Sequence, residues 1–391
     1  MANGLTPKQY LEALQEKIYV QRGINKPRVE SRPSREQTKY IDEWLHKWAS
    51  PTGLMLAEVD RLKATVEESF KTKVPTKFED PLGYNILCNL YDEIEAAASK
   101  LSIGLPISPQ LGTLPIGSIN AITIAVPGSD EYLVIFEQDL VIFALTLSKA
   151  IARAMFIGRT ADDKATLFFK NSNLSEILRN DEDMIVHFIE VIVSYLLLGT
   201  PSSAPMHPSE PESGLIAKYL SDSMLLFILG HECAHIMLGH LAYKKVKAAV
   251  AGEQIYKIER DWQQEREADG WGLSLMLQAM LTREMDLALS YWGADFFFSC
   301  FEIVERGLSL LMTGDESKRR LDSSHPPASE RRKLLREMLP QFGPQSAGAF
   351  ELAVKLEVLV EEIWKGVRSI LQQKYQEGQR PAARWQRVQP S

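Results

Sequence analysis

The segment FILGHECAHIMLGHL, residues 227–241, constrains the fold more strongly than any other stretch of the chain. It holds three of the seven histidines inside an apolar run. Buried imidazoles cost free energy unless they form hydrogen bonds or bind an ion. The segment therefore predicts a core helix that carries a buried polar site.

Two of these histidines have the spacing of metal ligands. His231 and His235 are four residues apart, so on an α-helix they share one face, about 40° apart. Glu232 is offset from His231 by about 100° and can reach a water molecule beside an ion held by the two imidazoles. This is the H-E-x-x-H pattern of zinc hydrolases. We therefore predict one Zn²⁺ per chain, with His231 and His235 as ligands and Glu232 as the catalytic base.

The third histidine does not fit as a ligand. His240 is nine residues after His231 and would lie on the far side of a continuing helix. The metzincin plan needs a glycine three residues, and a histidine six residues, after the second ligand. Gly239 and His240 come four and five residues after His235. We interpret His240 as a histidine that supports the site or the core.

A third ligand is predicted within residues 262–277, WQQEREADGWGLSLML. Glu265 and Asp269 are four residues apart, on one face of a predicted helix. Glu265 would complete a His/His/Glu site with one open position, and Asp269 could orient a ligand histidine by accepting its other ring N–H. Glu267 points elsewhere on this helix and is a weaker candidate. The alternative, an ordinary charged helix face, is disfavoured by the preceding motif and by the apolar residues that follow.

A fourth motif is SSHPPASERRKLLREML, residues 323–339. Its two prolines favour a stiff extended segment, and Ser329 can cap the helix that follows. Alone, the motif indicates a loop that enters a helix. Beside a zinc site, His325 could donate to a developing oxyanion, with Arg331 or Arg332 as the alternatives.

Together these motifs resemble those of a known group. H-E-x-x-H, then E-x-x-A-D, then S-x-H-P-P with arginines is similar to the gluzincin metallopeptidases of the HtpX and CAAX prenyl-protease type. Asn120 and Ala121, which open a predicted strand with Gly128 after it, resemble that group's substrate-binding strand. Members of the group are usually membrane-embedded, and this chain has no predicted span. This favours soluble relatives such as the Lit-type phage-exclusion proteases.

The resemblance implies a zincin-type catalytic core. It implies zinc ligands at His231, His235 and Glu265, the base at Glu232, an orienting carboxylate at Asp269, and His325 with Arg331 or Arg332 near the site. The substrate strand would begin at Asn120 and Ala121.

The rest of the sequence predicts an α+β fold that is predominantly α-helical. Periodicity and capping signals predict helices that begin after Thr6 and Ser34, and others near 54–72, 84–100, 139–156, 184–198 and 349–375. Residues 120–136, NAITIAVPGSDEYLVIF, are rich in β-branched and aromatic residues around a turn and predict a β-hairpin. We predict an N-terminal helical region (1–105), a metallopeptidase domain (106–345) with an exposed Pro-rich loop (199–214), a C-terminal helix (346–378) and a disordered basic tail (379–391).

Composition limits the partners and the compartment. A net charge of −7 gives no reason to expect nucleic acid as the main partner. The N-terminus lacks the layout of a secretory signal, and no charge-free stretch is long enough to span a membrane. Three cysteines in 391 residues fit a reducing compartment. We therefore expect a cytoplasmic protein without a transmembrane segment.

The sequence predicts a soluble zinc metalloendopeptidase that acts on a protein or peptide substrate. An unrestricted protease would damage its host, so we expect a latent site, sheltered by the N-terminal helices, by the 199–214 loop or by a regulatory protein partner. One alternative is a catalytically idle zinc-binding protein that acts through partner binding. Another is a zinc hydrolase that cleaves a non-peptide bond.

Overall fold

The computed structural model describes most of the chain. The described residues are 4–23, 64, 73–116, 119–159, 165–171, 173–205, 207, 210–241, 246–250, 253–257, 262–318 and 326–385. The helix predicted after Ser34 lies outside them, as does nearly all of the helix predicted at 54–72.

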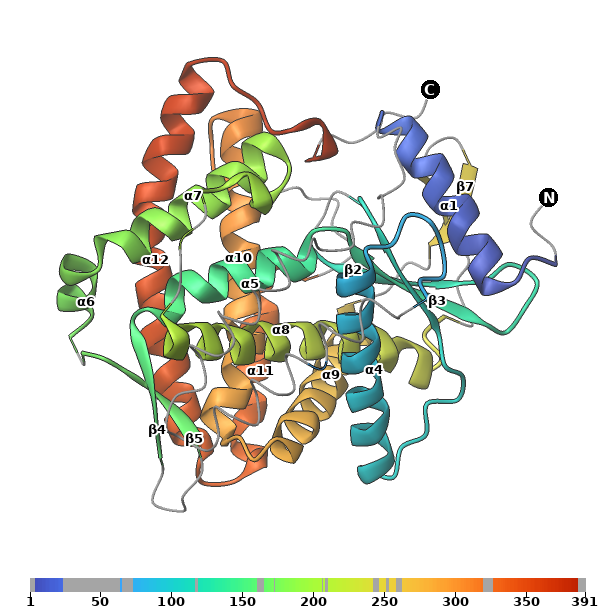
Figure 1. The fold of residues 1–391 in the computed structure, drawn as a ribbon, viewed down its shortest axis with the longest axis horizontal. Coiled ribbons are helices and arrows are strands. Elements are labelled where there is room, and N and C mark those ends of the chain that lie inside the picture. Colours follow the sequence, from blue (N-terminus) through green and yellow to red (C-terminus); the bar gives the residue numbers. More distant parts are fainter. Residues whose placement is uncertain are drawn as a thin grey trace.

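Long helices form most of the structure, and a few short strands lie beside them (Figure 1). The α-helices are α1 (Pro7–Gln21), α4 (Pro81–Lys100), α5 (Leu140–Ala152), α6 (Leu174–Asn180), α7 (Glu182–Leu198), α8 (Pro211–Met237), α9 (Trp262–Thr282), α10 (Leu287–Thr313), α11 (Ala328–Met338) and α12 (Ser346–Gln376). The strands are β1 (Gln110–Leu114), β2 (Ala121–Ala125), β3 (Tyr132–Glu137), β4 (Met155–Arg159), β5 (Ala165–Phe169), β6 (Val246–Val250) and β7 (Glu253–Lys257). Short 3-10 segments are η1 (Pro201–Ser203), η2 (Leu339–Phe342) and η3 (Ala383–Trp385). The predicted α+β class with a predominance of helix is confirmed.

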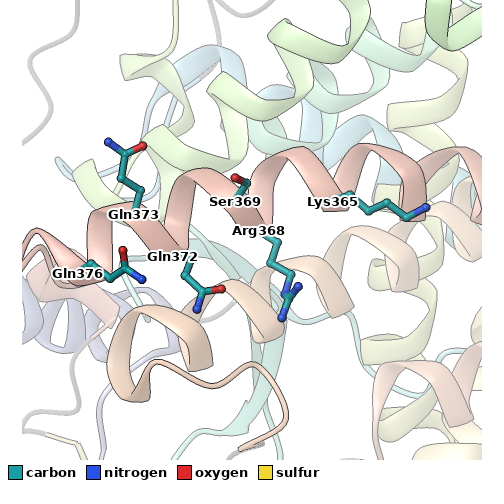
Figure 2. Close-up of a pocket in the computed structure, with 6 residues that line it drawn as sticks. All are labelled: Lys365, Arg368, Ser369, Gln372, Gln373 and Gln376. Atoms are coloured by element: carbon teal, nitrogen blue, oxygen red, sulfur yellow. The ribbon is translucent and has the colours of Figure 1, made fainter.

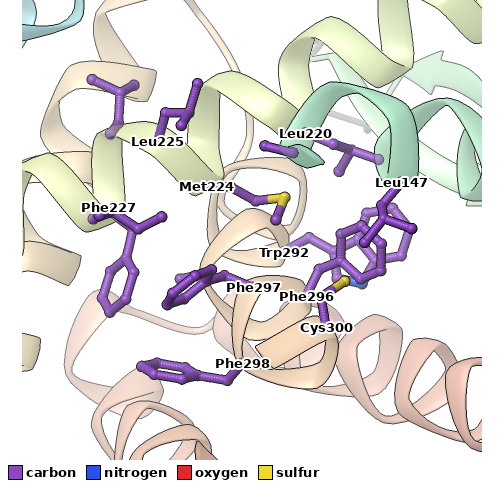
Figure 3. Packing of buried hydrophobic residues seen from close by; sticks show 14 of the residues in the cluster. Leu147, Leu220, Met224, Leu225, Phe227, Trp292, Phe296, Phe297, Phe298 and Cys300 are labelled. Carbon is purple, nitrogen blue, oxygen red and sulfur yellow. The ribbon is translucent and has the colours of Figure 1, made fainter. Parts of the chain in front are cut away.

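Helix α8 is the central helix, packed against α4, α5, α9 and α10. Figure 3 shows Met224 and Phe227 of α8 among the aromatic side chains of α10, including Trp292 and Phe297. A helix that is covered on all sides is apolar around its whole circumference. This explains the apolar character of residues 227–241 and places their histidines inside the protein.

A small sheet lies beside α8. Its strand order is β1-β3-β2, with β1 parallel and β2 antiparallel to β3. The hairpin predicted over 120–136 is confirmed: Ala121 pairs with Phe136, and Gly128 turns the chain with a φ of 79°. Because β3 lies between the other two strands, β2 is an edge strand of this sheet.

Alternate residues of β2 face opposite sides of the sheet, as the pleat requires. Ala121 belongs to the main core, and Thr123 hydrogen-bonds to α8. Ile122 and Ile124 instead pack with the apolar side chains of α1. Helix α1 therefore covers the face of the sheet that points away from α8.

Polar contacts fix α1 at both its start and its middle. Thr6 and Gln9 form the capping box that begins the helix, as the sequence predicts. The buried carboxylate of Glu79 accepts hydrogen bonds from Gln15 Nε2 at 2.5 Å and from the backbone N–H of Thr113 at 2.8 Å. Since a buried carboxylate needs such partners, this network holds α1 on β1.

Two hairpins were not predicted from the sequence. β4 pairs with β5 and β6 pairs with β7, both antiparallel. The helix predicted at 139–156 ends early as α5, because residues 155–159 form β4. A short apolar stretch does not distinguish a strand from the continuation of a helix. The helices predicted at 84–100, 184–198 and 349–375 are confirmed by α4, α7 and α12 within a few residues.

One hydrophobic core joins the segments that the sequence separates. Leu87 of α4, Leu147 of α5, Leu220 of α8 and Leu356 of α12 all belong to it. The described parts of 1–105, 106–345 and 346–378 therefore contribute to a common core.

The basic tail differs from the disordered segment expected at 379–391. Trp385 is buried and donates its indole N–H to Tyr195 O at 2.8 Å. Arg384 pairs with Asp139 at 2.6 Å. The partners of this segment lie on α7 and at the start of α5, so its own composition gives no sign of them. Residues 386–391 lie outside the described part.

Among the described residues, two helices are long and apolar enough to cross a membrane. They are α8 (Glu212–Met237) and α10 (Leu287–Thr313), whose apolar windows are 94% and 89% buried inside the structure. Core helices of globular proteins have the same length and composition. The expectation of a chain without a transmembrane segment stays a prediction.

Candidate metal centre

Three buried side chains from two helices meet near the carboxyl-terminal end of α8. His231 and His235 lie on α8 and Glu265 on α9, and none is more than 2% exposed. The two Nε2 atoms are 3.1 Å apart. The carboxylate oxygens of Glu265 lie 3.4 Å from Nε2 of His231 and 3.6 Å from Nε2 of His235. The structure thus brings together the three residues that the sequence predicts as ligands.

These distances fit a metal ion with the preferences of zinc. Tetrahedral zinc with bonds of about 2.0–2.2 Å places neighbouring ligand atoms about 3.3–3.6 Å apart. The two distances to the Glu265 oxygens lie within this range, and the 3.1 Å between the imidazole nitrogens is slightly shorter. Two imidazole nitrogens and one carboxylate are ligands that Zn²⁺ accepts, and they leave a fourth position open, as in catalytic sites. The donor set therefore passes the test of geometry and of chemistry.

Two glycines let α8 and α9 approach closely enough to form this site. A Cβ atom on Gly272 would lie 2.9 Å from the backbone nitrogen of His231, and one on Gly230 would lie 3.2 Å from Gly272 O. Glu265 lies about two helical turns before Gly272 on α9. Because the helices cross without side chains between them, the Glu265 carboxylate reaches both imidazoles.

His231 is supported by a buried ion pair. Its Nδ1 lies 2.9 Å from Oδ1 of Asp269, and Arg331 of α11 donates to the two Asp269 oxygens at 2.8 and 2.5 Å. Burial raises the pKa of Asp269, but Arg331 outweighs this effect and holds that pKa below its ordinary value. Burial lowers the pKa of His231, but the hydrogen bonds to Asp269 and Glu265 raise it to about 9. The site therefore favours a positive charge at His231, which a metal ion would supply in place of a proton.

His235 is supported by a second histidine. Its Nδ1 lies 2.9 Å from Nδ1 of His240, and Nε2 of His240 lies 3.1 Å from Oε2 of Glu267. Whereas Asp269 is fully buried, the Glu267 side chain is 45% exposed. Each candidate ligand histidine therefore has its second ring nitrogen in a hydrogen bond, as in known zinc sites.

The position of His240 differs from the prediction. Its spacing predicts the far side of a continuing helix, but α8 ends at Met237. Gly239 has a φ of 67°, and the backbone N–H of His240 donates to His235 O at 3.1 Å. This is the glycine-dependent turn that commonly ends helices, and it returns His240 to the site. Gly239 was the signal in the sequence that could have revealed it.

Glu232 is buried and lies beside the ligands. Its Oε1 is 4.0 Å from Nε2 of His231, and its Oε2 accepts a hydrogen bond from the Thr123 hydroxyl at 2.6 Å. Thr123 is on the α8-facing side of β2 and was not predicted as a site residue. The signal was a hydroxyl in an otherwise apolar strand, on the same face as Ala121. Thr123 fixes which oxygen of Glu232 is nearer the candidate ligands.

Of the two arginines predicted near the site, one is there. Arg331 contacts Asp269 and lies 4.0 Å from Oε2 of Glu265. Arg332 instead donates to Ser299 and Glu357, away from the candidate ligands, because consecutive helix residues point about 100° apart. His325 lies outside the described residues, and its role at an oxyanion stays a prediction.

Asn120 and Ala121 lead into β2, the strand that reaches α8 through Thr123. Asn120 O accepts a hydrogen bond from the backbone N–H of Glu137 at 3.0 Å, and Ala121 pairs with Phe136. These contacts occupy the β3 side of the strand. Strand β7 also contacts β2 but belongs to a different sheet. The use of β2 by a substrate stays a prediction.

The described part of the 199–214 loop and helix α1 lie away from the candidate ligands. The described part of the 199–214 loop contacts α7: His207 pairs with Glu190 at 2.6 Å. Residues 211–214, which were expected to belong to this loop, instead form the start of α8 at Pro211. His231 lies 20 residues after Pro211, about 30 Å along the helix. Helix α1 covers the opposite face of the sheet. In the described residues, neither this part of the loop nor α1 covers the candidate ligands. Helix α4, which also belongs to the N-terminal region, packs against α8 and α9. The expectation of a sheltered site stays a prediction.

A surface pocket lies on another helix (Figure 2). Its lining residues are Lys365, Arg368, Ser369, Gln372, Gln373 and Gln376. All belong to α12, which supplies none of the candidate ligands. This pocket is separate from the candidate metal centre.

Comparison with known proteins supports a peptidase. Residues 196–352 match the model of the family described as Peptidase U49. The match covers less than half of the chain, but it includes the whole of α8, α9 and α11. The part of the chain that forms the candidate site is therefore similar to a peptidase family. Comparisons with curated proteins and with solved structures found no match.

Proposed function

We propose that the protein is a zinc-dependent metalloendopeptidase. The observation that carries the proposal is the buried group of His231, His235 and Glu265, with Glu232 beside it, in a segment similar to a peptidase family. Neither part suffices alone. The family match supports a peptidase, and the donor set supports zinc as its metal.

His231, His235 and Glu265 would hold the zinc ion. Zinc in such a site supplies Lewis-acid chemistry: it polarises a carbonyl and makes water a better nucleophile near neutral pH. Asp269 and His240 orient the imidazoles for this task through their Nδ1 hydrogen bonds. Both histidines are thus held by a contact on the ring nitrogen that faces away from the proposed zinc position.

Glu232 is the proposed general base. It would take a proton from the attacking water molecule and deliver it to the leaving amine of the cleaved peptide bond. The Thr123 hydroxyl donates to Oε2 and so turns Oε1 toward the candidate ligands. The carboxylate is therefore held by one oxygen and acts through the other.

The edge strand β2 is the proposed binding site for the substrate backbone. An extended peptide can pair with an edge strand through main-chain hydrogen bonds, which give affinity with little choice of sequence. Thr123 links this strand directly to Glu232. A peptide paired with β2 would therefore lie beside the catalytic base.

The test compares the full-length wild type with Glu232→Gln at equal zinc content. We expect both proteins to bind about one zinc ion, and the variant to lose about 10²–10⁴-fold in kcat/KM on a quenched-fluorescent peptide library. Glu351→Gln on the exposed surface of α12 is the matched control and should cleave like the wild type.

Each contrary result removes a defined part of the proposal. Equal cleavage by wild type and Glu232→Gln would exclude Glu232 as the base. Failure of the wild type to bind zinc would exclude the metal centre. Zinc binding without cleavage of any peptide or cellular protein would favour the alternative, an idle zinc protein that acts through a partner.

A further inference from the structure

We infer that His240 and Glu267 are positioning residues that hold His235 in the tautomer able to bind the metal. The inference rests on the proposed zinc centre and adds two residues to it. Its basis is the chain of contacts from Nε2 of His235, through both rings, to the partly exposed Glu267 carboxylate.

The short contact between the two rings restricts their protons. Nδ1 of His235 and Nδ1 of His240 are 2.9 Å apart, so in neutral rings one nitrogen carries the hydrogen and the other accepts it. Two arrangements satisfy this contact. In one, His235 donates and its Nε2 is free of hydrogen. In the other, His240 donates and Nε2 of His235 carries the proton toward the candidate ligand atoms.

Glu267 selects between the two arrangements. A carboxylate accepts hydrogen bonds, so the 3.1 Å contact favours the hydrogen of His240 on Nε2. Nδ1 of His240 must then accept from His235. This leaves the lone pair of His235 on Nε2, the atom that faces His231 and Glu265. The selected arrangement is the one that a metal requires.

The local fold places His240 and Glu267 where they can orient His235. The turn at Gly239 brings His240 back beneath His235, where it is 6% exposed. Glu267 is two residues after Glu265 on α9, so its side chain points about 160° away from the ligand carboxylate. Helix α9 thus supplies the candidate ligand Glu265 on one side and, on another side, Glu267, which accepts the hydrogen bond from His240.

The experiment measures zinc affinity by competition with a chelator, in full-length protein that carries Glu232→Gln so that cleavage does not contribute. His240→Phe keeps a ring but removes the acceptor, and we expect it to weaken zinc binding about 10–100-fold. His240→Asn places an amide oxygen near the former Nδ1 and should restore most of that loss. Glu267→Gln, at a partly exposed position, should fall between them.

His207→Asn is the matched control, because it removes another histidine–glutamate pair, with Glu190, outside the metal centre. It should leave zinc affinity unchanged. A second readout is the ¹⁵N spectrum of histidine-labelled, zinc-free protein. The Nδ1–H form of His235 should dominate in the parent protein and lose population in Glu267→Gln.

The outcomes separate this inference from the proposed function. Wild-type zinc affinity in both His240→Phe and Glu267→Gln would overturn the positioning role while leaving the zinc centre intact. Absence of zinc binding in the parent protein would overturn the centre itself. If His240→Phe does not fold, Glu267→Gln and the tautomer spectrum still decide the question.

Discussion

The two candidate ligand histidines are supported in opposite ways. His231 contacts Asp269, which in turn pairs with Arg331, and these two charged side chains are 0% and 3% exposed. His235 instead contacts the imidazole of His240, which also contacts the carboxylate of Glu267 near the surface. The support of His231 is a buried ion pair, whereas the support of His235 ends at a carboxylate that is partly exposed to solvent.

This difference between the two histidines predicts which of the supporting residues affects folding stability as well as metal binding. A buried ion pair that loses one partner leaves an uncompensated charge in the core, which costs several kcal/mol. A histidine paired with an exposed glutamate carries no such cost, because water can replace the partner. We therefore expect changes at Asp269 to affect the whole fold and changes at Glu267 to affect mainly the metal.

The largest expected effect is that of Asp269→Ala. Removing this carboxylate leaves the guanidinium of Arg331 buried without its bidentate partner. We expect the free energy of unfolding of the zinc-free protein to fall by about 3–5 kcal/mol. Urea denaturation at pH 7.5 with a chelator present measures it. A loss below about 1 kcal/mol would mean that the two supports are energetically alike.

The pH dependence of stability should reveal the ionic support of His231 in zinc-free protein. Its pKa is raised in the folded state to about 9, above the ordinary 6.5. The resulting stabilisation is fully present below pH 6.5, declines as the pH rises, and is lost above about pH 9. It amounts to about 3 kcal/mol at most.

Urea unfolding at pH 6, 7.5 and 9 measures this decline. In Asp269→Asn the slope between pH 6 and 9 should be smaller, because the hydrogen bond to the carboxylate contributes most to raising this pKa. The same slope in both proteins would contradict the assignment to Asp269.

Double-mutant cycles should give different couplings within one support and between the two. Asp269→Ala and Arg331→Met act on one ion pair, so we expect a coupling energy of about 0.5–3 kcal/mol in the zinc-free protein. Asp269→Ala and Glu267→Ala lie on sides of α9 about 160° apart and should add within about 0.5 kcal/mol. Strong coupling in the second cycle would show that the supports are not independent.

The smallest expected effect on stability is that of Glu267→Ala. Its partner His240 remains in place, and the Glu267 side chain is 45% exposed. The free energy of unfolding of the zinc-free protein should change by less than about 1 kcal/mol. Thermal and urea unfolding measure this change. A larger loss would assign Glu267 a structural role and weaken the contrast with Asp269.

Most of the site that could be predicted lies within single helices and hairpins. The exception is the contact of Glu265 and Asp269 with the histidines of another helix, which the order of the motifs predicted. The spacing of His231, Glu232 and His235 fixes their relative directions wherever the helix is placed, because helical geometry is local. The alternation in β2 and the turn at Gly128 likewise follow from neighbouring residues. The same holds for the pairing of Glu265 with Asp269 on one helix face.

Contacts between separate segments required the folded protein. Thr123 and Glu232 are 109 residues apart in the chain and yet share a hydrogen bond of 2.6 Å. The choice of Arg331 over Arg332 depends on how α11 lies against α9. Periodicity gives the direction of a side chain from its own helix axis, but not which other element lies in that direction.

The amino-acid order therefore determined which residues could hold a metal and which carboxylate could act as a base. Asp269 was predicted to orient a ligand histidine, and the folded structure decided that this histidine is His231 and which side chains contact His235 and Glu232. His240 illustrates the division, since its spacing predicts one side of a helix, while the turn at Gly239 ends that helix and places the ring against His235. Local geometry is set by covalent and hydrogen-bond constraints a few residues long, whereas these supporting contacts depend on packing between elements that are distant in the chain.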